Sequence, residues 1–118
     1  MVIIVMGPPG SGHVVLGRVL ASDLGWPFVD AAVKGIAWQR EVNALVDRTL
    51  DRRDHCVVAS PDLTFSDRER LGGRRLLRIV DLGSPQLTRP GPDDGTLHLD
   101  AAKDPSILAA MIRRELGL

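Results

Sequence analysis

Residues 7–14 read Gly-Pro-Pro-Gly-Ser-Gly-His-Val, a glycine spacing that can wrap main-chain N–H groups around a phosphate. Loops of this kind carry Lys and then Ser or Thr after the last glycine, where the ammonium contacts phosphate and the hydroxyl holds Mg²⁺. Here those two positions are His13 and Val14. A valine side chain cannot ligate a metal, and a neutral imidazole replaces little of an ammonium. The segment therefore predicts a phosphate-binding main chain without its usual side-chain chemistry.

The residues expected to form this phosphate or nucleotide site are Gly7, Gly10, Ser11, Gly12, His13 and Val14. We expect the three glycines to supply positive φ angles and close approach, and the amides from Gly10 onward to point at the anion. Phosphate, ATP or ADP would bind weakly, and better as His13 gains a proton near its unperturbed pKa of about 6.5. The alternative is that the glycines serve only a tight turn and that His13 faces solvent.

The elements that must position this loop alternate between strand and helix. Apolar runs predict strands and apolar residues at helical spacing predict helices, while Gly25 is a stop signal and Asp104 followed by Pro105 is a cap. The predicted strands are 2–6, 27–30, 56–60, 76–82 and 96–100, and the predicted helices are 13–24, 36–51 and 105 to the end, with a short one near 66–71. The only loop-like stretch is 83–95.

Buried strands alternating with helices imply a three-layer α/β/α fold with a mostly parallel five-stranded sheet. A length of 118 residues suits a single domain covering 1–118. Ligands of such sheets bind at the carboxyl ends of the strands. The glycine loop leaves the first strand and opens the first helix, where main-chain amides and the helix dipole both favour an anion.

The amino-acid composition limits the kinds of partner that the chain can be expected to bind. The formal net charge is zero and the arginines are scattered among aspartates, which argues against a nucleic acid partner. The run 2–6 is too short to span a membrane, so no membrane partner is expected. Cys56 is the only cysteine, which excludes a disulfide within the chain and a cysteine-based metal site, and a reducing cytoplasm is the expected location.

The segment 2–30 resembles the opening of small-molecule P-loop kinases of the gluconate kinase and shikimate kinase type, and its paired prolines resemble the loop of adenylate kinases. Residues 56–60 with 67–71 are similar to the third strand and following helix of gluconate kinases, and 76–82 is similar to their next strand. The resemblance implies the P-loop NTPase fold, with ATP as phosphate donor, Mg²⁺ as metal and a small hydroxylated metabolite as acceptor.

The chain departs from that family at the parts that act on the nucleotide. The family has the loop Lys, the metal-binding Ser or Thr, an Asp-x-Asp pair after its second strand and an arginine-bearing lid between its last strands. This chain keeps Asp30 but has Ala32 in place of the second acid, and Arg89 is the only cation in 83–95. Because phosphoryl transfer depends on metal, cations and positioning, their joint loss predicts a rate lower by many decades and no Mg²⁺ site.

Asp30 and His13 are the residues that residual catalysis would have to use. An aspartate that ends a strand, as Asp30 does, is more often a turn former or helix cap. We expect Asp62 and Asp81 either to face the ligand-binding cleft at the carboxyl ends of the strands or to lie in loops.

Several other residues invite a chemical role that their surroundings do not support. His55 and His98 have no ligand partner at metal-binding spacing, so we expect them at the surface or at strand ends. Cys56 begins an apolar run and is expected in the core, and Trp26 and Trp38 are expected to be packing residues.

Three functions remain open. The favoured one is a degenerate kinase-like protein that keeps a weak phosphate or nucleotide site and acts as a pseudoenzyme or regulator. The second is an interaction module that pairs with another protein or with its own copy through this fold. The third is an active ATP-dependent kinase that uses substitutes such as His13, Asp30 and Arg18.

Overall fold

The computed structural model describes residues 1–8, 10–31, 38–61, 71, 76–83 and 96–118. Its elements are β1 (Val2–Met6), α1 (His13–Leu24), β2 (Phe28–Asp30), α2 (Trp38–Asp51), β3 (Cys56–Ser60), β4 (Leu77–Leu82), β5 (Leu97–Leu99) and α4 (Pro105–Leu116). The ranges of β1, α1 and β3 agree with the prediction. The other predicted strands are one residue too long at Pro27, Leu76, Thr96 and Asp100, and α4 ends at Leu116 instead of at the chain end.

Two predicted segments fall largely outside the described residues. The short helix near 66–71 is described only at Leu71, which is helical and fully buried in the core. The loop-like stretch 83–95 is described only at Gly83.

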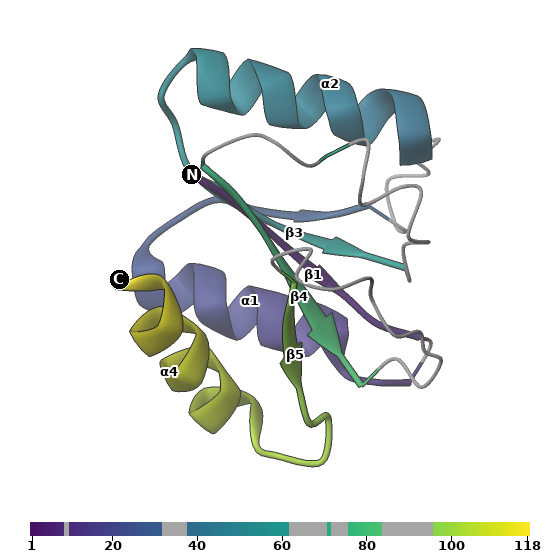
Figure 1. The fold of residues 1–118 in the computed structure, drawn as a ribbon, viewed down its shortest axis with the longest axis vertical. Coiled ribbons are helices and arrows are strands. Elements are labelled where there is room, and N and C mark those ends of the chain that lie inside the picture. Colours follow the sequence, from purple (N-terminus) through teal and green to yellow (C-terminus); the bar gives the residue numbers. More distant parts are fainter. Residues whose placement is uncertain (9, 32–37, 62–70, 72–75, 84–95) are drawn as a thin grey trace.

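The strands form one five-stranded sheet in the order β2-β3-β1-β4-β5, and every neighbouring pair is parallel. Helix α2 covers one face, and α1 and α4 cover the other (Figure 1). This arrangement confirms the predicted α/β fold and explains why the central strand β1 is apolar throughout. In the central strand β1, all side chains are at most 1% exposed.

Two apolar cores hold the layers together. Val2, Ile4 and Met6 of β1 pack with Val42 and Val46 of α2. The alternate residues Ile3 and Val5 pack on the other face, in a core that α1 and α4 complete with Leu16, Leu20, Leu108 and Ile112. Successive side chains of β1 therefore point to opposite faces of the sheet.

The helix ends follow the predicted signals. Helix α1 stops where Gly25 adopts a φ of 70° and its amide bonds back into the last turn. Helix α4 starts at Asp104, whose carboxylate accepts a hydrogen bond from the amide of Ser106 at 2.8 Å, with Pro105 in the first turn.

Helix α2 ends without a glycine. Arg53 adopts a φ of 57°. Its amide donates to the carbonyl of Leu50 at 3.0 Å, and the amide of Asp54 donates to the carbonyl of Thr49 at 2.9 Å. This is the hydrogen-bond pattern of a Schellman end, in which glycine normally takes the left-handed position.

Replacing Arg53 by glycine should stabilise the protein. The left-handed conformation costs an ordinary residue about 1–2 kcal/mol, and glycine loses about 0.5–1 kcal/mol more conformational entropy on folding, which leaves a net gain of about 0.5 kcal/mol. Urea-induced unfolding of wild type and Arg53→Gly measures this difference. A control, Arg52→Gly, places glycine in the neighbouring position and should destabilise; a loss of stability in Arg53→Gly would contradict the account.

Candidate functional site

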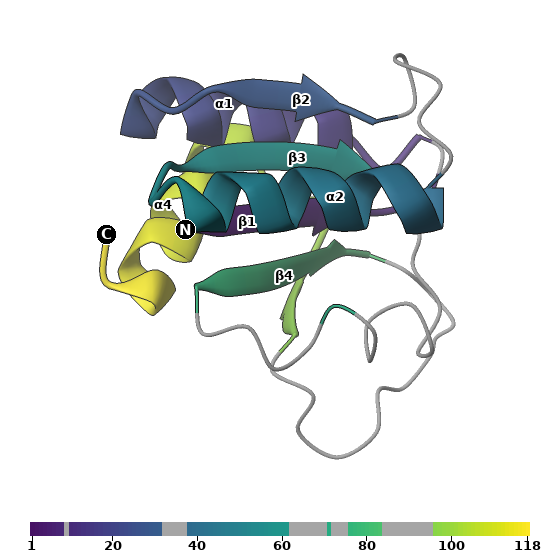
Figure 2. The same cartoon turned by 90° about the horizontal axis from the view of Figure 1, so that it is seen from above.

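The loop between β1 and α1 lies at the carboxyl edge of the sheet, beyond the tips of the strand arrows (Figure 2). Gly10 and Gly12 adopt φ angles of 85° and 87°. Both values lie in the left-handed region that side chains other than glycine's rarely enter. The predicted backbone form of the loop is therefore present at these two positions.

The expectation of a positive φ at Gly7 is wrong. Gly7 is a described residue, and its φ angle is not positive. It is required for space: a Cβ there would collide with the hydroxyl of Ser11 and would lie 3.1 Å from the carbonyl oxygen of Leu82 in β4. The first glycine of the motif thus lets the loop pass close to its own side chain and to the neighbouring strand.

The loop amides divide into two groups. The amide of Ser11 donates to the carbonyl of Pro8 at 3.0 Å, so it closes a turn inside the loop. The prediction that this amide points at an anion is therefore wrong. Helix α1 has no side-chain cap, and its first internal hydrogen bond runs from the amide of Leu16 to the carbonyl of Gly12 at 2.9 Å. The amides of Val14 and Val15 have no acceptor among the described residues, and they are the available donors at this helix end.

The ring of His13 lies back against the loop. Its Nδ1 is 3.2 Å from the hydroxyl of Ser11, and the side chain is half-buried. The position that usually carries an extended lysine is thus taken by a short side chain held within the loop.

Val14 is the second residue of α1, where the Mg²⁺ ligand would stand, and its side chain has no donor atom. In the part of the chain that the structure describes, no group of three or more His, Cys, Asp or Glu side chains is placed to hold a metal ion. The described residues therefore do not fit the magnesium site that the resemblance implies.

Asp30 reaches the same edge as the loop. It is the last residue of β2, is 9% exposed, and pairs in register with Ala59. Phe28, two residues earlier, packs in the core of α1 and α4, so Asp30 lies on the face that α1 covers. Asp62 lies outside the described residues.

Asp81 pairs with His98, which the sequence predicts at the surface or at a strand end. Strands β4 and β5 are in register at these two residues, and Nδ1 of His98 is 3.1 Å from the carboxylate of Asp81. Asp81 is 4% exposed, whereas the side chain of His98 is 44% exposed. Asp81 is also in register with Met6, next to the loop. A buried acid thus orients an accessible imidazole two strands away from the start of the loop.

Three of the remaining candidates, Trp26, His55 and Cys56, lie at the opposite edge of the sheet. The rings of Trp26 and His55 stack with centroids 4.5 Å apart and an interplanar angle of 10°. Cys56 is 4% exposed, in agreement with its expected core position. The side chain of Trp38 lies outside the described residues. A cavity at this edge, which no sequence motif indicates, is taken up below.

Comparison with solved structures supports the fold. A Janibacter sugar kinase superposes with a TM-score of 0.79 at 18% identity, covering 98% of this chain and 94% of that one. A gluconokinase from Sinorhizobium meliloti gives 0.63 at 19% identity, with 98% and 94% covered. A shikimate kinase from Aquifex aeolicus gives 0.64 at 18% identity, with 99% and 96% covered. The chain therefore has the fold of these P-loop kinases, as its loop segment predicts.

Sequence comparison gives a related but partial match. The cytidylate kinase of Methylococcus capsulatus is 29% identical over 120 residues, which cover 98% of this chain and 50% of that protein. The chain thus spans about half the length of this curated relative. No protein-family model matches the sequence. Among the described residues, no helix is long and apolar enough to cross a membrane.

Substituting Gly7 by alanine should destabilise the protein by about 1–3 kcal/mol, because the new methyl group meets the Ser11 hydroxyl and a fixed carbonyl. Chemical unfolding of Gly7→Ala, Ser11→Gly and the double variant measures the coupling between the two positions. Part of the loss should return in the double variant, since the collision with Ser11 is removed. Additive losses would show that the two residues do not meet.

Cys56 should react slowly in the folded protein. Burial raises the pKa of its thiol above the ordinary 9.0, and the side chain is shielded from solvent. Alkylation by iodoacetamide should therefore be slower than in the urea-unfolded chain by on the order of 100-fold.

The same shift makes stability fall at alkaline pH. The neutral thiol's contribution is complete below the ordinary pKa and is lost as pH rises through the higher folded pKa. Cys56→Ala removes this group, so a variant that loses stability above pH 9 as steeply as wild type would refute the assignment.

Proposed function

We propose that the loop of residues 7–14 binds inorganic phosphate, or the phosphate end of a nucleotide such as ATP or ADP, mainly through its main chain and does not transfer the phosphoryl group. The protein would then act as a pseudoenzyme or regulator on a kinase fold. The observation that carries the proposal is the combination of left-handed Gly10 and Gly12 with an α1 N-terminus that has no side-chain cap.

Binding without transfer follows from the contrast between main chain and side chains. The available amides of Val14 and Val15 and the positive end of the α1 dipole suit an anion, and neither depends on the side chain that follows the last glycine. Transfer needs a metal and fixed cations around the migrating group. The half-buried His13 and the apolar Val14 supply neither.

The relatives support a nucleotide or phosphate ligand but not a particular substrate. The matched proteins include a sugar kinase, a gluconokinase, a shikimate kinase and a cytidylate kinase, whose names denote different acceptors. Their names all denote kinases, which bind the phosphate group that they transfer. A phosphate site is therefore the property that we carry over to this chain.

Calorimetry with sulfate, phosphate, ADP and ATP tests the proposal. We expect dissociation constants on the order of 1 mM, with tighter binding at pH 6 than at pH 8 because an imidazole gains a proton over that range. Sulfate is the decisive probe, since its own charge does not change between these pH values. His13→Gln should remove the pH dependence of sulfate binding and keep the folded structure.

A gain-of-function variant separates the loop from the rest of the site. His13→Lys with Val14→Ser restores the usual cation and hydroxyl, and nucleotide affinity should rise at least tenfold. Gly12→Ala is the matched control, because it strains the left-handed residue and should abolish binding. Absence of any heat with all four ligands, or turnover of ATP with an acceptor by the wild-type protein, would overturn the proposal.

A further inference from the structure

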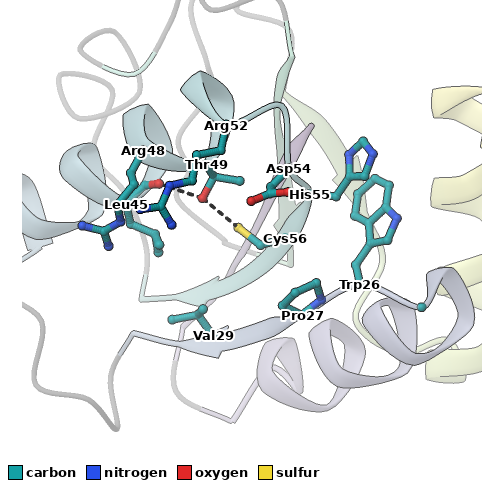
Figure 3. Close-up of a pocket in the computed structure, with 11 residues that line it drawn as sticks. Trp26, Pro27, Val29, Leu45, Arg48, Thr49, Arg52, Asp54, His55 and Cys56 are labelled. Atoms are coloured by element: carbon teal, nitrogen blue, oxygen red, sulfur yellow. Dashed lines mark hydrogen bonds between the residues drawn. The ribbon is translucent and has the colours of Figure 1, made fainter.

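A cavity of about 470 Å³ opens at the amino edge of the sheet, away from the loop of residues 7–14 (Figure 3). Its walls come from the segment entering β2, the last two turns of α2 and the segment entering β3. Small-molecule sites in proteins occupy about 300–1,000 Å³, so this cavity has room for a small organic ligand.

The floor of the cavity is apolar. Val29 and Leu45 line it beside the thiol of Cys56. The hydroxyl of Thr49 donates to the carbonyl of Leu45 at 2.8 Å, and its oxygen lies 3.9 Å from the sulfur of Cys56. These polar atoms satisfy one another, so the floor suits the apolar body of a ligand better than its charged group.

Two stacked aromatic rings stand at one end of the cavity. Trp26 and His55 both line the cavity and stack almost in parallel on each other. In Figure 3 the stack stands beside Pro27, at the end away from Leu45 and Arg48. Aromatic rings in a binding site contact the apolar or aromatic part of a ligand, so this pair favours a ligand with an aromatic body.

The rim carries two guanidinium groups. Arg48 lies in the last turn of α2 and Arg52 directly follows the helix, with its amide bonded to the carbonyl of Arg48 at 3.2 Å, and both line the cavity. Both residues are exposed, and neither has a carboxylate within salt-bridge distance among the described residues. The single acid in the lining is Asp54. Two guanidinium groups without carboxylate partners favour an anionic ligand, because their planar donors match carboxylate and phosphate oxygens.

The end of α2 does not repel such an anion strongly. The carbonyls of residues 48–50, which would present negative partial charge, each accept a hydrogen bond from the amides of residues 52–54 at 2.9–3.2 Å. Those carbonyls are turned into the Schellman end of the helix. Arg48 and Arg52 therefore contribute most of the charge at the rim of the cavity.

We infer that this cavity binds a small organic anion, a carboxylate or phosphate monoester on a flat apolar body, with Arg48 and Arg52 holding the charged group. The apolar body lies over Val29, Leu45 and Cys56, beside the stacked rings of Trp26 and His55. The site is separate from the phosphate loop, so it stands whether or not the loop binds phosphate.

Titrations followed by amide NMR spectra test the inference. The probes are benzoate, phenyl phosphate, the neutral benzamide and inorganic phosphate. Benzoate or phenyl phosphate should move the signals of Trp26, Thr49 and Cys56, and the tighter of the two identifies the charged group. Benzamide should bind at least tenfold more weakly than benzoate. Inorganic phosphate should move the loop signals of Gly10 and Gly12 and leave the cavity signals in place.

Variants locate the charge. The double change Arg48→Gln with Arg52→Gln should weaken binding of the organic anions at least tenfold and keep the loop response to phosphate. Arg114→Gln is the matched control, since Arg114 is an exposed arginine in the last turn of α4, and it should bind as wild type does.

Three results would overturn the inference. The first is equal binding of benzamide and benzoate, and the second is unchanged binding by the double variant. The third is movement of signals at the loop alone, which would assign the organic anions to the phosphate site.

Discussion

The turn from β1 into α1 is the constraint on which the rest of the molecule depends. Strand β1 is hydrogen-bonded between β3 and β4 and is at most 1% exposed, so its position is set by both cores. The chain leaves it at Met6 and must begin α1 at His13 on one face of the sheet. Left-handed Gly10 and Gly12, and a Gly7 without a side chain, make this turn possible. The first amides of α1 consequently face the carboxyl edge whatever side chains follow.

Binding and transfer have different energetic sources at such a turn. A helix N-terminus stabilises an anion by about 0.3–2 kcal/mol, whereas a fixed cation about 4 Å from a phosphate contributes about 4 kcal/mol at an intermediate dielectric. The first contribution survives the exchange of side chains at positions 13 and 14, and the second does not. If the loop binds phosphate as proposed, it does so with the first contribution and without most of the stabilisation that a transition state needs.

The sequence predicts those features that local signals determine. The bounds of α1 and β3 follow from Gly25 and from an apolar run between polar residues, and the α4 cap follows from Asp104. The pairing of Asp81 with His98 could not be predicted, because it joins residues 17 apart through the register of two parallel strands. The direction of His13 and the engaged amide of Ser11 depend equally on the exact path of the loop.

The cavity at the amino edge illustrates the same limit and has a structural cause. Strand β2 has three residues and pairs with β3 only over Val57–Ala59, so Cys56 at the head of β3 has no ladder partner on that side. Just before β2 begins, the carbonyl of Pro27 accepts one hydrogen bond from the amide of Val57 in β3 at 2.9 Å. The chain before Pro27 leads back to α1. The last turns of α2 project over this gap and bring Arg48, and Arg52 directly after the helix, to its rim. A short edge strand under a longer helix thus creates the space, and no residue of the phosphate loop lines it, so side chains at positions 13 and 14 do not contribute to the cavity.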